Sequence, residues 1–284
     1  MGAEGDRSHP RRALRLLLRL PLKIFLPREH GSWAVLAAPV VVGFCAARGG
    51  PPLTQALFCC AALGGFLLRP ALAAFFFPKP NEDGAWPSLI FAGALALGGL
   101  APLFLLYDRA GLAWFALPAA VLLIADLLLR RGRRSFGLFS ELSGILILCL
   151  GAPAAIYAAR GVMSADAWWV WLLSALFFSG PIFHVKLAAL QHRASVDPGL
   201  IGSLPRARTT GAIYHAAALL IAAAGAVLGP VPALATLPFA AALIKNLRRG
   251  ARPPAKVDFR ALGYQEVGYS VLFALTVSAG YLLR

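Results

Sequence analysis

The sequence predicts an all-α protein, a polytopic transmembrane helical bundle of about nine spans, and three observations lead to this fold class. First, 59% of the 284 residues are hydrophobic and only 14% are charged, whereas soluble domains are about half apolar and a quarter charged. Second, apolar runs long enough to cross a bilayer core recur from about residue 32 to the C-terminus. Third, these runs are continuous, which indicates helices, because the strands of a membrane barrel alternate apolar and polar residues.

Nine apolar runs, taken in order, define the expected helices. Several boundaries fall at turn signals rich in Gly and Pro, such as RGGPP at 48–52, DRAG at 108–111 and LGPVP at 228–232. The expected spans are 32–48, 53–77, 87–107, 111–129, 138–159, 167–188, 210–229, 231–247 and 265–283. The eighth run is short and contains prolines, so eight spans are the alternative. Because no linker or clear repeat divides the chain, residues 28–284 are expected to form a single transmembrane domain.

The distribution of Lys and Arg predicts the orientation of the bundle, because loops on the cytoplasmic side carry an excess of these residues. If the N-terminus is cytoplasmic, only four of the 27 Lys and Arg residues fall on the outer side, namely Arg48, Arg109, Arg160 and Arg284. We therefore expect a cytoplasmic N-terminus and a C-terminus on the outside. The net charge of +15 is explained in the same way, so no nucleic-acid partner is expected.

The basic segment 1–27 has two interpretations. Arg11, Arg15 and Arg19 recur every four residues, with leucines on another face, as in an amphipathic helix that lies on the cytoplasmic membrane surface. Alternatively, the arginines only fix the orientation of the first span. Arginines interrupt the apolar residues throughout, so a cleaved signal peptide is not expected.

Ionisable side chains gather at the predicted cytoplasmic ends of the spans, and such residues in membrane proteins are costly and often functional. Contact with lipid headgroups would explain lysines and arginines, but it explains the carboxylates less well. We therefore expect these side chains to converge on a cavity open to the cytoplasm, with simple headgroup contact as the alternative. The candidate catalytic acid–base residues are Glu29, His30, Glu141, His215 and Glu266. The candidate substrate-binding residues are Arg28, Arg69, Lys79, His184 and Lys186.

Arg69 and the three histidines among the candidates raise more specific expectations. Arg69 precedes Pro70, which lacks a backbone N–H and tends to kink a helix, so the second span is expected to have a broken inner end. His30, His184 and His215 have glutamates nearby in the predicted cluster. However, the chain has no closely spaced ligand pair such as HxxxH, so no metal site is predicted, and the sequence points to no particular cofactor.

Four segments, in the order PREHGSWAVLAAPVVVGF, FSELSGILILCLGAPAAIYAARG, LFFSGPIFHVKLAAL and LGYQEVGYSVLFAL, resemble the YwiC-like family of bacterial integral membrane proteins. The resemblance extends over about residues 27–283. It implies a location in the bacterial inner membrane, and it implies no particular reaction. It also implies that the following residues belong to the family's characteristic motifs: Arg28, Glu29, His30, Gly31, Trp33, Glu141, Gly144, Gly151, Pro153, Lys186 and Glu266.

The expected architecture is also similar to that of UbiA-type prenyltransferases, which have nine helices, a cytoplasmic N-terminus and a cavity that faces the cytoplasm. In the regions that correspond to their acidic motifs this chain has Glu82, Asp83 and Asp197. The NDxxDxxxD pattern is absent, and magnesium bound to diphosphate needs clustered carboxylates. The resemblance therefore extends to the architecture and not to the magnesium–diphosphate chemistry.

The function that these observations favour is a membrane-embedded enzyme or binder of a lipidic substrate. An isoprenoid or other apolar tail would lie among the spans, in contact with membrane lipid, and an anionic head would meet the cytoplasmic cluster. One alternative is a small-solute transporter or permease, for which charged groups near the middle of the membrane would be expected. The other alternative is an assembly subunit of a membrane complex.

Overall fold

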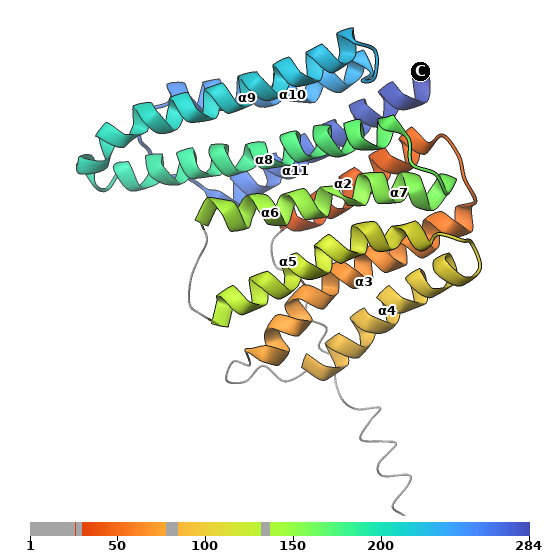
Figure 1. Cartoon of the computed structure of the whole chain (residues 1–284). Coiled ribbons are helices and arrows are strands. Elements are labelled where there is room, and N and C mark those ends of the chain that lie inside the picture. The colour runs from red at the N-terminus through yellow and green to blue at the C-terminus, as the bar shows by residue number, and fades with distance from the viewer. Residues whose placement is uncertain (1–25, 27–29, 78–84, 132–136) are drawn as a thin grey trace, which may run out of the picture.

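The computed structural model describes residue 26 and residues 30–77, 85–131 and 137–284, and all regular elements within these ranges are helical (Figure 1). The helices are α2 (His30–Ala47), α3 (Pro52–Phe76), α4 (Ala85–Leu105), η1 (Ala110–Leu112), α5 (Ala113–Arg131), α6 (Gly137–Cys149), α7 (Gly151–Arg160), α8 (Ala165–Ala194), η2 (Pro198–Ser203), α9 (Leu204–Val227), η3 (Ala233–Thr236), α10 (Leu237–Ala251) and α11 (Phe259–Leu283). The predicted all-α fold is confirmed. Almost all of segment 1–27 lies outside the described ranges, so its amphipathic helix stays a prediction.

Six helical stretches in the described ranges are long and apolar enough to cross a membrane, which supports a multi-pass membrane protein. They are Pro52–Phe76, Ala85–Leu105, Glu141–Arg160, Ala165–Ala194, Pro198–Val227 and Phe259–Leu283. Two shorter apolar helices, Gly31–Ala47 and Ala110–Ala125, occupy the expected first and fourth spans. The expected eighth span corresponds to α10, which has only 15 residues. Its last turns are polar and include Lys245 and Arg248, so its apolar part is shorter still.

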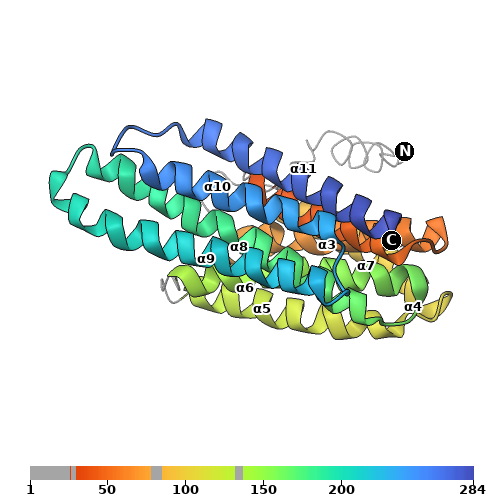
Figure 2. The same cartoon turned by 90° about the horizontal axis from the view of Figure 1, so that it is seen from above.

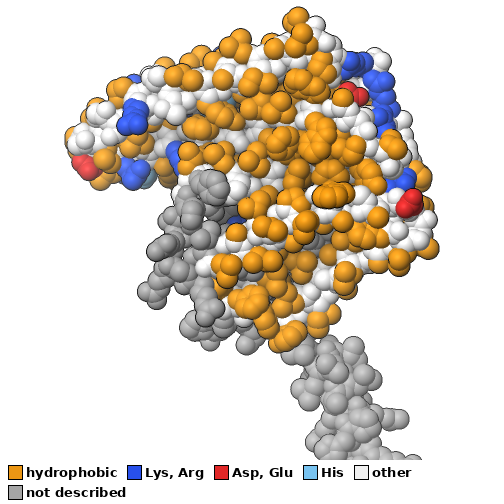
Figure 3. Space-filling model, viewed as in Figure 1, with side chains coloured by type: hydrophobic (Ala, Val, Ile, Leu, Met, Phe, Trp, Pro, Cys, Tyr) orange, Lys and Arg blue, Asp and Glu red, His pale blue; other side chains and the backbone are white. Residues whose placement is uncertain are grey.

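The helices pack in layers (Figures 1 and 2). A central group of α2, α7, α8 and α11 shares the largest hydrophobic core, in which the rings of Phe177 on α8 and Phe273 on α11 stack with centroids 4.5 Å apart. Helices α9 and α10 cover one side of this group, and α3, α4 and α5 cover the other. The surface view shows a broad apolar band with Lys and Arg gathered towards the two ends of the helices (Figure 3), as expected for a bundle that meets lipid.

The expected break at Pro70 is wrong, because α3 continues through Pro70 to Phe76. A proline removes only one hydrogen bond from the helix, and close packing against α4 compensates for that loss. The packing depends on Gly64 and Gly99, since a methyl group on Gly99 would meet the Leu57 carbonyl oxygen and one on Gly64 would meet the backbone of α4. Helix α3 is therefore continuous through Pro70 and packs closely on α4.

The fifth expected span, in contrast, is two helices. Helix α6 ends at Cys149 and α7 begins at Gly151. Pro153 lies in the first turn of α7, where it cannot donate the hydrogen bond that would continue α6, and Leu150 instead closes a tight turn onto the Ile147 carbonyl at 2.9 Å. Seven of the ten residues of α7 are buried, so this short alanine-rich helix lies inside the bundle.

The four arginines that were assigned to the outer side cap backbone carbonyl groups at one end of the bundle. Arg160 donates from Nε to the Ala47 oxygen at 2.7 Å and from Nη2 to the Ala46 oxygen at 3.1 Å, and Arg48 donates from Nε to the Tyr281 oxygen at 2.9 Å. Arg109 and Arg284 make similar bonds to the carbonyl groups of Tyr107, Ala158, Gly229 and Pro230. The last carbonyl groups of a helix lack intrahelical partners, so these exceptions to the charge asymmetry have a local structural cause.

Candidate functional site

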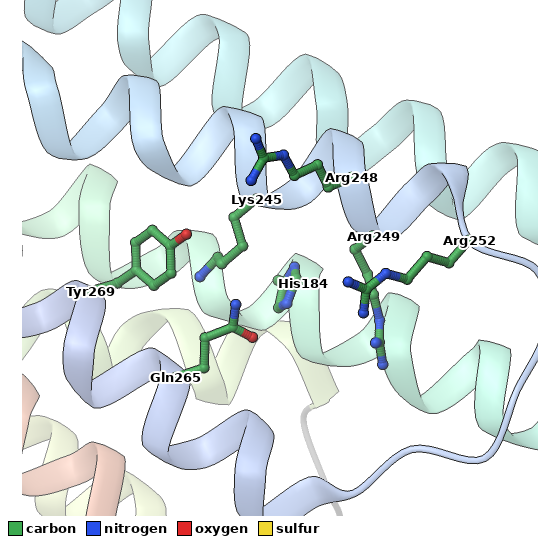
Figure 4. Close-up of a pocket in the computed structure, with 7 residues that line it drawn as sticks. All are labelled: His184, Lys245, Arg248, Arg249, Arg252, Gln265 and Tyr269. Atoms are coloured by element: carbon green, nitrogen blue, oxygen red, sulfur yellow. The ribbon is translucent and has the colours of Figure 1, made fainter.

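A pocket lies between α8, α10 and α11, near the end of the bundle that is predicted to be cytoplasmic (Figure 4). Its lining residues, which we call the basic pocket, are His184, Lys245, Arg248, Arg249, Arg252, Gln265 and Tyr269. The cavity measures about 130 Å³, whereas one buried water needs roughly 10–15 Å³ on a comparable scale. The basic pocket can therefore hold a small polar group of several atoms.

The spacing of residues along each helix explains why these side chains meet. Three arginines follow Lys245 at helical spacing: Arg248, Arg249 and Arg252 lie three, four and seven residues after it. The four cations therefore share one face of α10 and of the turn that follows it. Gln265 and Tyr269 lie four residues apart on α11 in the same way. The three helices that supply the lining side chains also pack on one another.

Lys245 and Glu266 form a buried ion pair at the wall of the basic pocket. The Lys245 ammonium lies 2.8 and 2.7 Å from the two carboxylate oxygens of Glu266, and the side chains are only 4% and 11% exposed. The ammonium also lies 4.3 Å from the centre of the Tyr269 ring, and Figure 4 shows it between Tyr269 and His184. Because a buried charge without a partner is strongly destabilising, each member of the pair holds the other in place.

His184 is buried next to this pair without a hydrogen bond of its own. Its side chain is 2% exposed, and its Nε2 atom lies 3.8 Å from Oε1 of Glu266, which is too far for a hydrogen bond. Neither ring nitrogen has a hydrogen-bond partner among the described residues. Because an unsatisfied buried polar group costs about 1–3 kcal/mol, the ring of His184 is ready to accept a partner from the pocket.

The arginines give the basic pocket its excess of positive charge. Arg249 and Arg252 lie next to each other in Figure 4, and the Nε and Nη2 atoms of Arg249 are buried without a hydrogen-bond partner in the described part of the chain. Within the same ranges no carboxylate lies within ion-pair distance of Arg248, Arg249 or Arg252. A guanidinium group matches the geometry of a carboxylate or phosphate, so this arrangement suits an anion.

Residues from α8 and α9 hold the end of α10 in position. Gln191 is buried and donates from Nε2 to the carbonyl oxygens of Arg249 and Arg252, both at 3.0 Å. Arg208 on α9 donates to the same Arg252 oxygen at 3.1 Å. In addition, His192 accepts a hydrogen bond from the Val257 amide at 3.0 Å. These contacts fix the backbone from which the pocket arginines project.

Of the ten candidate residues from the sequence, the structure brings His184 and Glu266 together at the basic pocket. Glu141 and Lys186 instead pair with each other at 2.7 Å, between α6 and α8, where their side chains are 47% and 48% exposed. Lys186 follows His184 by two residues, which is a rotation of about 200° around a helix. The same helix α8 therefore directs His184 to the basic pocket and Lys186 to another neighbour.

His215 forms a second layer behind the pocket. It lies on α9, is 4% exposed, and packs against Gly180 of α8, where a methyl group would lie 2.6 Å from its Cε1 atom. Asn246 packs against Gly211 in the same manner. Both glycines therefore make room for a buried polar side chain, although neither His215 nor Asn246 lines the basic pocket.

The remaining candidates are not brought to the basic pocket. Arg69 lies on the exposed side of α3, which takes no part in forming it. His30 begins α2, but its side chain is outside the described set. Residues outside the described ranges are Arg28, Glu29, Lys79, Glu82 and Asp83. Their roles stay predictions.

Metal-binding groups do not gather in the described ranges. Asp197 accepts a hydrogen bond from the Gly199 amide at 3.0 Å, as the cap of η2. No group of three or more His, Cys, Asp or Glu side chains in the described part of the chain is arranged to hold a metal ion. Nothing in these ranges therefore resembles a carboxylate-bound magnesium site.

Sequence reasoning missed most of the pocket lining. Arg248, Arg249 and Arg252 were interpreted only as a topology signal, and Gln265 and Tyr269 were not among the candidates. The periodicity of the cations along α10 was the available signal. It was ambiguous because a cationic face on a helix end usually meets solvent or headgroups.

Comparison with known proteins finds a family match over part of the chain. The family model described as YwiC-like protein matches residues 26–156. The uncharacterized protein YwiC of Bacillus subtilis (strain 168) is 25% identical over 166 residues, which are 58% of this chain and 67% of the relative. No solved structure matches the chain significantly, so the similarity to UbiA-type prenyltransferases stays a prediction. The resemblance to the YwiC-like family is therefore confirmed for residues 26–156, which are less than half of the chain.

Proposed function

We propose that the protein binds a lipidic ligand in the membrane by its anionic head, which enters the basic pocket. The observation that carries this proposal is the guanidinium of Arg249, which has two buried nitrogen atoms without hydrogen-bond partners among the described residues. Buried charged groups are normally paired. A phosphate or carboxylate in the pocket would accept hydrogen bonds from Arg249 and would also neutralise Arg252 beside it.

The position of the pocket along α8 supports a headgroup. Helix α8 has 30 residues, so at 1.5 Å per residue it is about 45 Å long, which exceeds a hydrocarbon core of about 30 Å. The stretch from Ala165 to His184 alone spans roughly 30 Å. If α8 enters the membrane near its first turn, His184 lies at the far boundary of the core, where lipid headgroups lie.

The apolar part of the ligand would remain outside the pocket. The cavity of about 130 Å³ has room for a head and not for a long chain. Large apolar side chains on the adjoining helices are exposed, including Ile244 and Leu247 on α10 and Phe259 on α11. An isoprenoid or other tail would lie along these surfaces, in the space that membrane lipid otherwise fills.

Transport of a small solute is less well supported by this geometry. Transporter sites are expected near the middle of the membrane, where a path can open alternately to both sides. The basic pocket lies instead at one end of the bundle, and the four outer arginines at the other end are engaged with backbone carbonyl groups. The geometry therefore favours a site for a lipid head.

The proposal is tested by thermal unfolding of the detergent-purified protein with octyl phosphate, inorganic phosphate and octanol. A ligand at about 100 times its Kd should add roughly 2.7 kcal/mol to stability. We expect octyl phosphate to raise Tm, octanol to leave it unchanged, and Arg249→Gln to abolish the shift. The matched control is Arg206→Gln, which removes an exposed arginine at the same end of the bundle and should keep the shift. An equal shift with octanol, or with Arg249→Gln, would refute an anion site in this pocket.

A further inference from the structure

We propose that an anionic head binds in the basic pocket together with one proton, which His184 takes up from solvent. This inference rests on the proposed function and adds how binding at that site depends on pH. No covalent bond changes: the free protein, the anion and one proton give a complex in which the imidazole of His184 has become an imidazolium.

The observation behind this inference is the hydrogen bonding of His184. A neutral imidazole carries one N–H donor and one acceptor nitrogen. In the structure both nitrogens are buried, and neither has a partner within the described ranges. The ring is 2% exposed and lines the pocket, so a ligand that enters the cavity comes into contact with it.

Most of the charged groups around His184 are cationic. The described charged or titratable groups that face it or line the same pocket, from α9, α10, α11 and the turn after α10, are His215, Lys245, Arg248, Arg249, Arg252, Glu266 and Tyr269. Glu266 is the carboxylate in this set, and its charge is already matched by Lys245 at 2.7 Å. On α8 itself, Lys186 pairs with Glu141 on α6. The charged groups around His184 are therefore cationic on balance.

An anion in the pocket reverses this balance. Its negative charge offsets Arg249 and Arg252, so protonation of His184 no longer adds to an uncompensated positive field. The imidazolium has two N–H donors, and two acceptors are then available: an oxygen of the ligand and Oε1 of Glu266, now 3.8 Å away. Each hydrogen bond would involve a charged group and would be stronger than a neutral one. Protonation and anion binding therefore favour each other.

The test measures proton uptake when octyl sulfate binds. A sulfate ester keeps its single negative charge across the neutral range, so any proton that is taken up must come to the protein. Calorimetric titration of the detergent-solubilised protein in Pipes and in Tris, which differ in ionisation enthalpy, gives the number of protons per bound anion. We expect close to one, and an affinity that falls by about tenfold for each unit of rising pH above neutrality.

Two variants show where the proton goes. His184→Gln is expected to bind octyl sulfate with no proton uptake and with an affinity that does not change with pH. The control, His215→Gln, removes the buried histidine on α9 that does not line the pocket, and it should retain uptake. His184→Asn serves if the glutamine variant does not fold, and the absence of proton uptake by the unaltered protein would by itself overturn the inference.

The outcomes separate this inference from the proposal on which it rests. Octyl sulfate binding without proton uptake would overturn the role of His184 and leave the anion site intact. Uptake that persists in His184→Gln would also overturn it, because another group would then carry the proton. If neither octyl sulfate nor octyl phosphate binds, the anion site itself is refuted.

Discussion

Substitution of Glu266 by Gln should lower the free energy of unfolding much more than the same substitution of Glu141. Both carboxylates lie 2.7 Å from a lysine ammonium, but the pair of Glu266 with Lys245 is 11% and 4% exposed, whereas the pair of Glu141 with Lys186 is about half exposed. Loss of one partner from a buried ion pair costs about 3–5 kcal/mol, and an exposed pair contributes about 0–1 kcal/mol. We expect about 3 kcal/mol for Glu266→Gln, since Lys245 keeps its contact with the Tyr269 ring.

A double-mutant cycle tests the origin of this loss. Lys245→Met alone should also cost about 3–5 kcal/mol, because it leaves the Glu266 carboxylate buried with the His184 ring at 3.8 Å, which is too far for a hydrogen bond. The combined variant should recover much of the stability, because a buried pair can be replaced by apolar and neutral groups at little cost. We expect a coupling energy of about 2 kcal/mol or more between the two positions.

The assay is equilibrium unfolding of each variant in the same detergent. Pulse proteolysis measures the folded fraction at each denaturant concentration. Glu141→Gln is the matched control, because it removes a carboxylate with the same lysine distance and greater exposure. If Glu266→Gln and Glu141→Gln lose equal stability, or if the losses in the cycle are additive, the ion pair at the pocket wall is not the buried contact described above.

Three further predictions concern the frame around the site. Gly64→Ala should destabilise the protein by about 1–3 kcal/mol because the methyl group meets the backbone of Ala96, whereas Gly65→Ala, with nothing within 4 Å, should be neutral or slightly stabilising in the same unfolding assay. Arg160→Gln should lower the free energy of unfolding by about 2 kcal/mol, because it removes two hydrogen bonds to carbonyl groups of α2. An unchanged denaturation midpoint would contradict the capping role. Alkaline phosphatase fused to the C-terminus should be active in a bacterial host, and an inactive but expressed fusion would reverse the predicted orientation.

The helices could be predicted from the sequence where apolar runs end at Gly and Pro, and they could not where a single proline acts inside a run. The expected span 138–159 becomes two helices because Pro153 cannot donate the hydrogen bond that would continue α6. Pro70 also lacks a donor, but packing against α4 carries α3 on to Phe76. The difference lies in the neighbouring helices, which the local sequence does not reveal.

The candidate site could be predicted only as a set of residues near one end of the bundle. His184 and Glu266 lie close together, whereas Lys186 pairs with Glu141 on another face of α8. Which of these faces points to the pocket depends on how α8 is rotated against α10 and α11, and this rotation is a property of tertiary packing. Arg249 was not predicted as a pocket residue for another reason: a basic residue after an apolar run is already explained by membrane orientation.

The measurement that tests the central claim most directly is an experimental structure of the protein determined with octyl phosphate. The account predicts density for the phosphate in the basic pocket, within hydrogen-bond distance of Arg249 and His184, with the alkyl chain directed along the apolar surface of α10. A phosphate bound at the exposed pair of Lys186 and Glu141, or at the outer arginines, with the basic pocket filled by water alone, would contradict it.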